Sequence, residues 1–271
     1  MAIHMVKLID THAHIQFAAY DDIREKVLAD AAEHETGVIV VGCEQESSEA
    51  AVALVKDRPG LWAAVGQHPT DTGLPFDIKK FRELAKAQKV VAIGECGLDY
   101  YRIQGIGERL DVIEKQKSMF EAQIGLAHEI NLPLIIHCRD AYEDMVAILF
   151  KRFSTPSSHP HPPKEHGVLH CFTGTVSEAQ SYLDLNFLIS FTGIITFADQ
   201  YDDVVAHVPL EKILIETDAP FLTPKPHRGK KNHPSYVRFV AERIAEIKGI
   251  STDTVAAQTT ENAIRLFRLH S

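Results

Sequence analysis

The chain has 271 residues, of which 45% are hydrophobic and 24% charged, as in ordinary soluble globular proteins. The length suits one α/β barrel of about 250 residues, so we expect a single domain over residues 1–271. A formal net charge of −9 argues against a general nucleic-acid coat, which would be basic. No apolar run approaches the roughly 20 residues of a membrane span, which predicts no membrane association.

Cysteine usage and the start of the chain bear on the compartment. Four cysteines in a chain of this length do not suggest a disulfide framework. The N-terminus shows no basic segment followed by an apolar stretch, so no signal peptide is expected. Reduced thiols favour a cytoplasmic protein, and we expect that location.

Short apolar runs recur along the chain and alternate with stretches of helical spacing. Runs such as VIVV, VVAI and LPLII are typical of strands buried on both faces, as in a parallel sheet. Helical spacing is clearest over Ser118–Ile130 and Ser235–Ile247. The alternation predicts an α/β fold of the TIM-type (β/α)8 barrel, with an open doubly wound sheet as the alternative. The expected strands are Val6–Asp10, Val38–Gly42, Leu61–Gly66, Val90–Gly94, Leu132–Ile136, Gly167–Leu169, Phe187–Phe191 and Lys212–Ile215.

A segment rich in proline and serine, Ser154–His166, is expected to form a loop before the sixth strand. Loops that lead into barrel strands lie at the face opposite the active site. We therefore expect His159, His161 and His166 to be exposed to solvent and not to bind metal.

Histidines and carboxylates follow most of the apolar runs at their C-terminal ends, where barrel enzymes build their active sites. Residues two apart in extended backbone point the same way, so His12 and His14 can hold one cation. The pair alone is a weak signal, but other strand ends carry further ligands. The candidate metal ligands are His12, His14, Glu95, His137, His170 and Asp218.

This donor set is large enough for two metal ions. Four imidazoles and two carboxylates suffice for two divalent ions if one carboxylate bridges them, and Glu95 is the expected bridge because it sits midway around the ring. Two ions about 3.5–4 Å apart can lower the pKa of a bound water and stabilise both the attacking and the leaving oxygen. By affinity, imidazole-rich sites favour Zn2+, Mn2+ or Co2+ over Mg2+.

Several stretches closely resemble the TatD family of metal-dependent deoxyribonucleases, within the amidohydrolase superfamily. The stretches are, in family order, IDTHAHI, GQHP, GECGLDYYR, IHCRDA, LHCFTG, ETDAPFL and TTENAIRLF. The resemblance runs from about Asp10 to Phe267, nearly the whole chain. Many amidohydrolases bridge their metals with a carboxylated lysine. Glu95 takes that place here, as in the TatD pattern, which weakens an interpretation as a dihydroorotase or a urease-like enzyme.

The resemblance implies how the ligands are divided between the ions. Nucleases of this family are associated with Mg2+, so we expect two divalent ions, Mg2+ or Mn2+ in function, with Zn2+ as an alternative. The first ion would be held by His12, His14, Glu95 and Asp218, and the second by Glu95, His137 and His170.

The resemblance also implies the catalytic and pocket residues. Asp218 would take a proton from the nucleophilic water, beside the bridging Glu95. His68 would contact the substrate phosphate. Asp99 and Tyr100, in the GECGLDYYR stretch, would line the pocket with it.

Four further residues at or after the eighth strand carry expectations. Arg228 lies on a basic Pro/Gly-rich loop, and the TatD pattern also has an arginine here. Since its guanidinium suits bidentate contact with phosphodiester oxygens, we predict that Arg228 binds substrate. Lys230 and Lys231 are expected to be ordinary surface lysines. Glu216 either orients a metal ligand or points outward to a structural partner, and the sequence leaves both open.

These observations predict a metal-dependent hydrolase that cleaves phosphodiester bonds of DNA, and the resemblance implies 3′-to-5′ exonuclease action. The expected partner is DNA or a nucleic-acid fragment as substrate, with no obligatory protein partner. One alternative is an amidohydrolase that cleaves a small lactone, ester or amide. Another is a non-catalytic metal-binding protein, whose mark would be a lost ligand, and none of the candidate ligands is lost.

Overall fold

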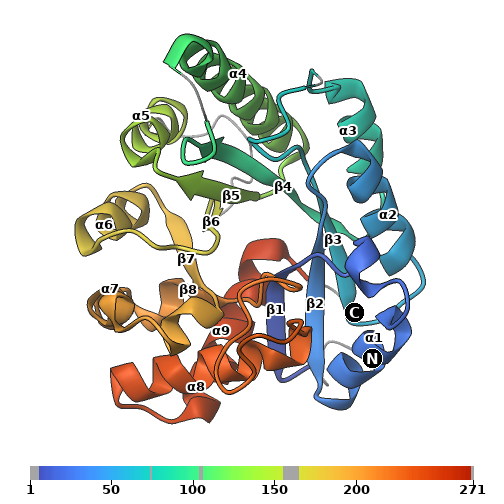
Figure 1. The fold of residues 1–271 in the computed structure, drawn as a ribbon, viewed down its shortest axis with the longest axis vertical. Coiled ribbons are helices and arrows are strands. Elements are labelled where there is room, and N and C mark those ends of the chain that lie inside the picture. The colour runs from blue at the N-terminus through green and yellow to red at the C-terminus, as the bar shows by residue number, and fades with distance from the viewer. Residues whose placement is uncertain (1–5, 74, 104–105, 155–164, 270–271) are drawn as a thin grey trace.

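Eight parallel strands form one sheet in the order β1 to β8, and the helices surround it (Figure 1). The computed structural model describes residues 6–73, 75–103, 106–154 and 165–269. Over these ranges, no helix combines the length and apolar composition needed to cross a membrane. The strands are β1 (Leu8–Ala13), β2 (Thr36–Val41), β3 (Leu61–Val65), β4 (Val90–Asp99), β5 (Leu134–Arg139), β6 (Gly167–Leu169), β7 (Phe187–Phe191) and β8 (Ile213–Ile215). The helices are α1 (Arg24–Glu33), α2 (Gln45–Val55), α3 (Ile78–Leu84), α4 (Ile106–Ile130), α5 (Tyr142–Phe153), α6 (Val176–Asp184), α7 (Asp202–His207), α8 (Val237–Lys248) and α9 (Thr252–Phe267).

The strands are buried on both faces because their apolar residues supply two separate cores. In β2, Ile39 and Val41 belong to one hydrophobic cluster, while Val38 and Val40 belong to the other. This alternation follows from the period of two in extended backbone. The cluster with Ile39 takes residues from strands all around the sheet and fills the barrel interior. The other lies between the strands and the surrounding helices. The predicted TIM-type barrel is thereby confirmed.

Helix α9 covers the end of the barrel at which the strands begin. Thr260 donates a hydrogen bond from Oγ1 to the carbonyl of Lys7 at 2.9 Å, just before β1. Asn262 Nδ2 donates to the carbonyl of Ile213, the first residue of β8, at 2.8 Å. Phe267 packs into the interior cluster. The C-terminal ends of the strands are therefore the end available for a site.

The barrel closes between β1 and β8 through a short backbone bridge and through the side chain of Asp10. Ala13 and Ala219 form an isolated parallel bridge beyond the end of β8. Asp10, which is fully buried, accepts hydrogen bonds from the Thr217 amide at 2.9 Å and from the Thr217 hydroxyl at 2.5 Å. Burial raises the pKa of Asp10 well above its ordinary value, although the hydrogen bonds from Thr217 oppose this effect.

The expected elements form, and two of them are much longer than predicted. β4 continues past the predicted Val90–Gly94 as far as Asp99, because its polar second half pairs with β5, where Gly97 lies opposite His137. In this half, Glu95 and Asp99 face the site, whereas Cys96 and Leu98 pack into the cluster between the strands and the helices. Polar and apolar residues therefore alternate, and no continuous apolar run reveals this part of the strand. Helix α4 likewise begins at Ile106, well before the predicted Ser118.

One expectation about the proline-rich loop is wrong. His166 is half-buried and not exposed, because its ring packs against Phe153 at 4.5 Å and Phe187 at 5.8 Å between ring centroids. It lies where the chain enters β6, outside the groups of side chains that could hold metal among the described residues. His159 and His161 lie outside the described residues.

Candidate metal centre

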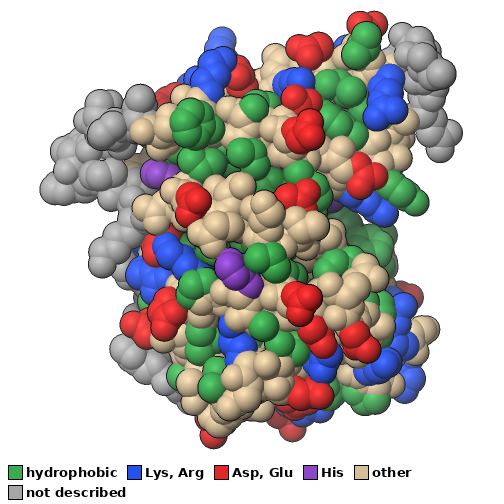
Figure 2. Space-filling view, turned by 90° about the vertical axis from the view of Figure 1, so that its left-hand side faces the viewer, with side chains coloured by type: hydrophobic (Ala, Val, Ile, Leu, Met, Phe, Trp, Pro, Cys, Tyr) green, Lys and Arg blue, Asp and Glu red, His purple; other side chains and the backbone are tan. Residues whose placement is uncertain are grey.

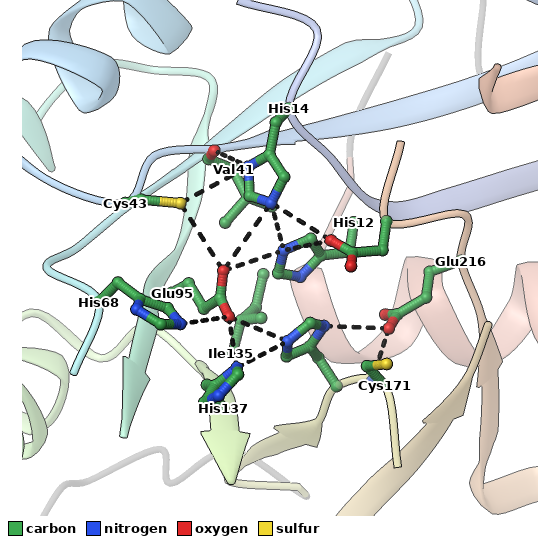
Figure 3. Close-up of polar contacts among 12 residues, drawn as sticks. His12, His14, Val41, Cys43, His68, Glu95, Ile135, His137, Cys171 and Glu216 are labelled. Atoms are coloured by element: carbon green, nitrogen blue, oxygen red, sulfur yellow. Dashed lines mark hydrogen bonds and ion pairs between the residues drawn. The ribbon is translucent and has the colours of Figure 1, made fainter. Parts of the chain in front are cut away.

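The candidate ligands converge at the C-terminal ends of the strands, and Figure 3 shows how they face one another. They come from opposite sides of the barrel, so only closure of the sheet brings them together. The structure assembles all of those expected from the sequence: His12 in β1 and His14 just after it, Glu95 in β4, His137 in β5, His170 after β6 and Asp218 after β8.

The first donor group surrounds a point between β1, β4 and β8. His12 Nε2 lies 3.2 Å from His14 Nε2, 3.3 Å from Glu95 Oε2 and 3.9 Å from Asp218 Oδ1. His14 Nε2 lies 3.9 Å from the same Glu95 oxygen and 3.3 Å from the same Asp218 oxygen. Donor atoms bound at about 2.1 Å to one ion are separated by distances of this order.

The second donor group uses the other oxygen of Glu95. His137 Nδ1 lies 2.8 Å and His170 Nε2 lies 2.9 Å from Glu95 Oε1, and the two nitrogens are 3.3 Å apart. His68 Nε2 is 3.4 Å from this oxygen as well. Glu95 therefore directs one carboxylate oxygen into each donor group, as a carboxylate that bridges two ions would.

Hydrogen bonds on the far side of two rings decide which nitrogen faces the centre. His14 Nδ1 lies 2.8 Å from the carbonyl of Val41, which can only accept, so Nδ1 carries the proton and Nε2 presents a lone pair. His170 Nδ1 lies 3.1 Å from Glu216 Oε1, with the same consequence for its Nε2. Of the two roles left open for Glu216, the structure shows that it orients a candidate ligand.

The same logic applies to His137 and supports a cation site. His137 Nε2 lies 3.2 Å from Asp99 Oδ2, so Nδ1 is free to face Glu95. His12 Nδ1 is buried with no hydrogen-bond partner among the described residues. Lone pairs of imidazole and carboxylate would thus converge on the centre once a cation replaces the protons that neighbouring carboxylates favour on His14 and His170. Such a set suits divalent cations, so the residues present fit two metal ions.

The charges within the centre reinforce one another. Burial alone would raise the pKa of Glu95, but His170, His68 and His12 lower it well below its ordinary value. Burial opposes the charged form of His170 too, yet Glu95 and Glu216 raise its pKa well above the usual range. Despite burial, hydrogen bonding to His14 lowers the pKa of Asp218. Glu95 and Asp218 are therefore ionised at neutral pH.

Close backbone approach beside the centre requires a glycine. Gly97 in β4 has φ +139°, and a Cβ there would lie 2.0 Å from the carbonyl oxygen of His137 in β5. Only glycine tolerates both the conformation and the contact. It allows β4 and β5 to carry Glu95 and His137 side by side.

A cavity of about 760 Å³ opens above the centre. His68 lines it, as the sequence predicts. Asp99 is buried beneath His137, and of the described residues neither it nor Tyr100 lines the cavity. The Tyr100 hydroxyl donates to Asp144 Oδ2 at 2.7 Å, so its side chain points away into the layer of helices.

The structure does not bring Arg228 to the cavity. Its Nη1 donates to the carbonyl of Thr223 at 3.1 Å, and its guanidinium lies 3.9 Å above the ring of Phe197. The arginines that line the cavity are Arg102 and Arg139. Neither was expected from the sequence, although Arg139 is the last residue of β5 and Arg102 lies shortly after the end of β4.

Another missed residue is Cys43, which follows β2 and lines the cavity. Its thiol donates to Glu95 Oε2 at 3.7 Å and lies 3.7 Å from His14 Nδ1 (Figure 3). Its position directly after an apolar run is the sequence feature that could have identified it. All four cysteines of the chain are free.

Comparison with known proteins agrees with this geometry. Residues 9–268 match the family described as TatD related DNase. An uncharacterized metal-dependent hydrolase, YabD of Bacillus subtilis, is 42% identical over 97% of this chain and 100% of its own. The 3′-5′ ssDNA/RNA exonuclease TatD of Erwinia tasmaniensis is 32% identical over 97% of this chain and 100% of its own.

The similarity extends to the whole fold, as comparison with a solved structure shows. The crystal structure of YJJV, a TatD homolog from Escherichia coli K12, superimposes with a TM-score of 0.86 at 29% identity, covering 98% of this chain and 99% of the other. The resemblance seen in the sequence motifs is thereby confirmed over nearly the full length. The chain belongs to the TatD-related DNase family of metal-dependent hydrolases.

Proposed function

We propose that this protein hydrolyses phosphodiester bonds of DNA with two divalent ions, working as a 3′-to-5′ exonuclease in the cytoplasm. One observation carries the two-ion part: Glu95 directs Oε2 toward His12 and His14, and Oε1 toward His137 and His170. When bound, the ions would lower the pKa of a water and neutralise charge on the phosphate. Mg2+ or Mn2+ are the proposed ions in function, with Zn2+ as an alternative.

The chain's own residues then have distinct tasks. Asp218 is ionised and partly exposed at the cavity floor, so its carboxylate can accept the proton of the attacking water. Burial lowers the pKa of His68, which keeps the ring neutral. Its Nδ1 faces Thr70 Oγ1 at 2.7 Å, which fixes the ring so that it can contact a phosphate oxygen. Glu95 links the two donor groups, because it directs one carboxylate oxygen into each of them.

Arg102 and Arg139 are the proposed phosphate contacts, because both line the cavity. Arg228 is a weaker candidate, since its guanidinium already holds the loop carbonyl of Thr223. On the face that includes α5, α6 and α7, basic side chains are scattered among acidic ones (Figure 2). Affinity for nucleic acid is therefore proposed to arise in the cavity and not from a basic coat.

The names of relatives support DNA or RNA as substrate, since the Erwinia relative is a 3′-5′ ssDNA/RNA exonuclease. The alternative, hydrolysis of a small lactone, ester or amide, would use the same centre to polarise a carbonyl. The arginine pair favours the phosphodiester, because a neutral ester needs no cationic contact in the cavity.

The test is a substrate panel on protein stripped of metal and reloaded with Mg2+, Mn2+ or Zn2+ separately. Oligonucleotides labelled at the 5′ end, single- and double-stranded, would be digested beside a carboxyl ester. We expect chelation to abolish cleavage, Mg2+ or Mn2+ to restore it, and products to shorten one nucleotide at a time. Cleavage by protein shown to be metal-free by elemental analysis would contradict the two-ion mechanism. Turnover of the carboxyl ester alone would favour the alternative.

A further inference from the structure

The cavity above the metal centre has two unlike walls. The loops that follow β1, β7 and β8 contribute an apolar wall, and the segments at the ends of β4 and β5 contribute the arginine pair Arg102 and Arg139. We define the apolar wall as Phe17, Ile194, Tyr201, Phe221 and Leu222.

Phe221 is the most informative member of the apolar wall. Its side chain is 52% exposed, although large apolar side chains usually avoid water. Its ring centroid lies 6.3 Å from that of His14, and Phe17 stacks on the same imidazole at 4.6 Å with an 8° interplanar angle. An aromatic face is thus left open to the cavity beside the first donor group.

The backbone that carries Phe221 is fixed in place. Its amide donates to the carbonyl of Asp218 at 2.8 Å, and its own carbonyl accepts from Asn232 Nδ2 at 2.6 Å. Asn232 is fully buried and also donates to the carbonyl of Thr217 at 2.9 Å. The exposed ring therefore sits on a rigid support tied to Asp218, as a preorganised binding surface would.

The opposite wall selects for negative charge. The Arg139 guanidinium lies 3.8 Å above the ring of Tyr101, which holds it in place. Its N–H groups have no hydrogen-bond partner among the residues that the structure describes, so they can meet an anion. Arg102 Nε lies 3.9 Å from Asp99 Oδ2, and its side chain is largely exposed. A ligand that satisfies both walls has a flat apolar part on one side and an anionic group on the other.

We infer that the apolar wall binds the nucleobase of the nucleotide whose 5′-phosphate lies over the metal centre, by stacking on Phe221. The arginine pair would then face the next phosphate of the strand. Stacking tolerates any sequence, because every base has a π-face. This inference rests on the proposed function and names the feature of the substrate that the cavity recognises.

The inference can be tested with two chromogenic esters, of which one carries a nucleoside and the other a methyl group in its place. They are thymidine 5′-(4-nitrophenyl phosphate) and methyl 4-nitrophenyl phosphate, and the readout is the ratio of their kcat/KM values. We expect the ratio to fall by roughly tenfold in Phe221→Ala, within the range of stacking effects, and to recover in Phe221→Trp. The control is Phe150→Ala, which removes a similarly exposed ring from α5 and should keep the wild-type ratio. An unchanged ratio in Phe221→Ala, or an equal fall in Phe150→Ala, would overturn the inference.

A binding measurement separates this inference from the proposed function. The probe is 2-aminopurine deoxyriboside 5′-monophosphate, whose fluorescence is quenched when the base stacks. We expect the wild-type protein and Phe150→Ala to quench it, and Phe221→Ala to quench it far less. If the wild-type protein hydrolyses neither ester, the proposed function fails, but quenching that depends on Phe221 still supports the base site. No quenching by the wild-type protein rejects the base site whatever the esters show.

Discussion

Glu95 couples the two halves of the metal centre, because each of its oxygens meets a different pair of histidines. Asp218 belongs to the first donor group alone, facing His12 and His14 through Oδ1. Loss of charge at the two positions should therefore have different consequences. Glu95 contributes to the binding of both metal ions. Asp218 contributes to the binding of one ion and is also the proposed acceptor of the proton from the water.

Replacing each of the two carboxylates with its amide separates these roles. We expect Glu95→Gln to lose at least one metal ion and activity with it, since too little negative charge remains between the two donor groups. Asp218→Asn keeps the shape and one oxygen donor but no longer accepts a proton, so kcat should fall by about 10²–10⁴-fold with a smaller loss of metal. Metal content by elemental analysis, measured beside kcat for both variants, checks this. Near-normal kcat in a fully loaded Asp218→Asn protein would show that the proton goes elsewhere.

Glu216 controls the metal centre indirectly. Its Oε1 accepts from His170 Nδ1 and from the Cys171 amide, and its Oε2 accepts from the Ser190 hydroxyl at 2.7 Å. Glu216→Gln keeps the shape but removes the charge that favours a proton on Nδ1 of His170. We expect metal affinity to fall by roughly tenfold, near the lower end of reported effects for such partners. Competition with a chelating dye measures it. Ser190→Ala is the control, and its effect should be smaller, because it leaves the contact with His170 intact.

At the scale of elements, the ends of the strands could be predicted because each ligand lies within a few residues of the end of an apolar run. Parallel strands that close into a barrel must bring these ends together, whatever the loops do. His12, His137 and His170 could thus be grouped before any coordinates were known. The polar half of β4 could not be found in this way, since its pairing with β5 depends on contact between strands far apart in sequence.

The conformation of the loops could not be predicted from the sequence either. Arg228 looked like a phosphate ligand because it lies on a basic loop after β8, but the loop turns its guanidinium toward Thr223 and Phe197. Arg139 is the last residue of β5, so the strand itself aims it at the cavity. Local sequence does not show in which direction the loop after β8 turns the side chain of Arg228.

The two arginines can be compared directly. We expect Arg139→Ala to raise KM for single-stranded DNA and to reduce the slope of log affinity against log salt by about 1, as for one lost phosphate contact. Arg228→Ala should change both quantities less, because its guanidinium is occupied within its own loop. Titration of labelled oligonucleotide at several salt concentrations gives the slopes. A larger effect at Arg228 than at Arg139 would reverse the assignment and restore the expectation from sequence.

At the scale of the whole molecule, closure of the barrel holds the metal centre together. β1 supplies His12, and the segment after β8 supplies Asp218, so the first donor group spans the seam between them. The seam contains the isolated bridge of Ala13 with Ala219, and the amide of Asp218 donates to the carbonyl of His12 at 2.9 Å. Because β8 has only three residues, the side chain of Asp10 adds contacts that a longer strand would make with its backbone.

Asp10 should therefore be important for stability although it touches no substrate. Its Oδ1 accepts from the amides of His12 and Thr217, and its Oδ2 accepts from the Thr217 hydroxyl. Asp10→Ala leaves two buried N–H groups without an acceptor, which should lower the free energy of unfolding by roughly 3 kcal/mol. Asp10→Asn retains one acceptor oxygen and should lose less.

Urea unfolding of the metal-free proteins gives these values without the added stability of bound ions. Metal affinity supplies a second readout, because a loosened seam moves His12 and Asp218 apart and should weaken the first donor group more than the second. Co2+ loaded in steps would report the two groups separately through its absorption. If Asp10→Ala unfolds at the wild-type urea concentration and binds both ions normally, the seam is held by backbone contacts alone, and closure of the barrel does not depend on this carboxyl group.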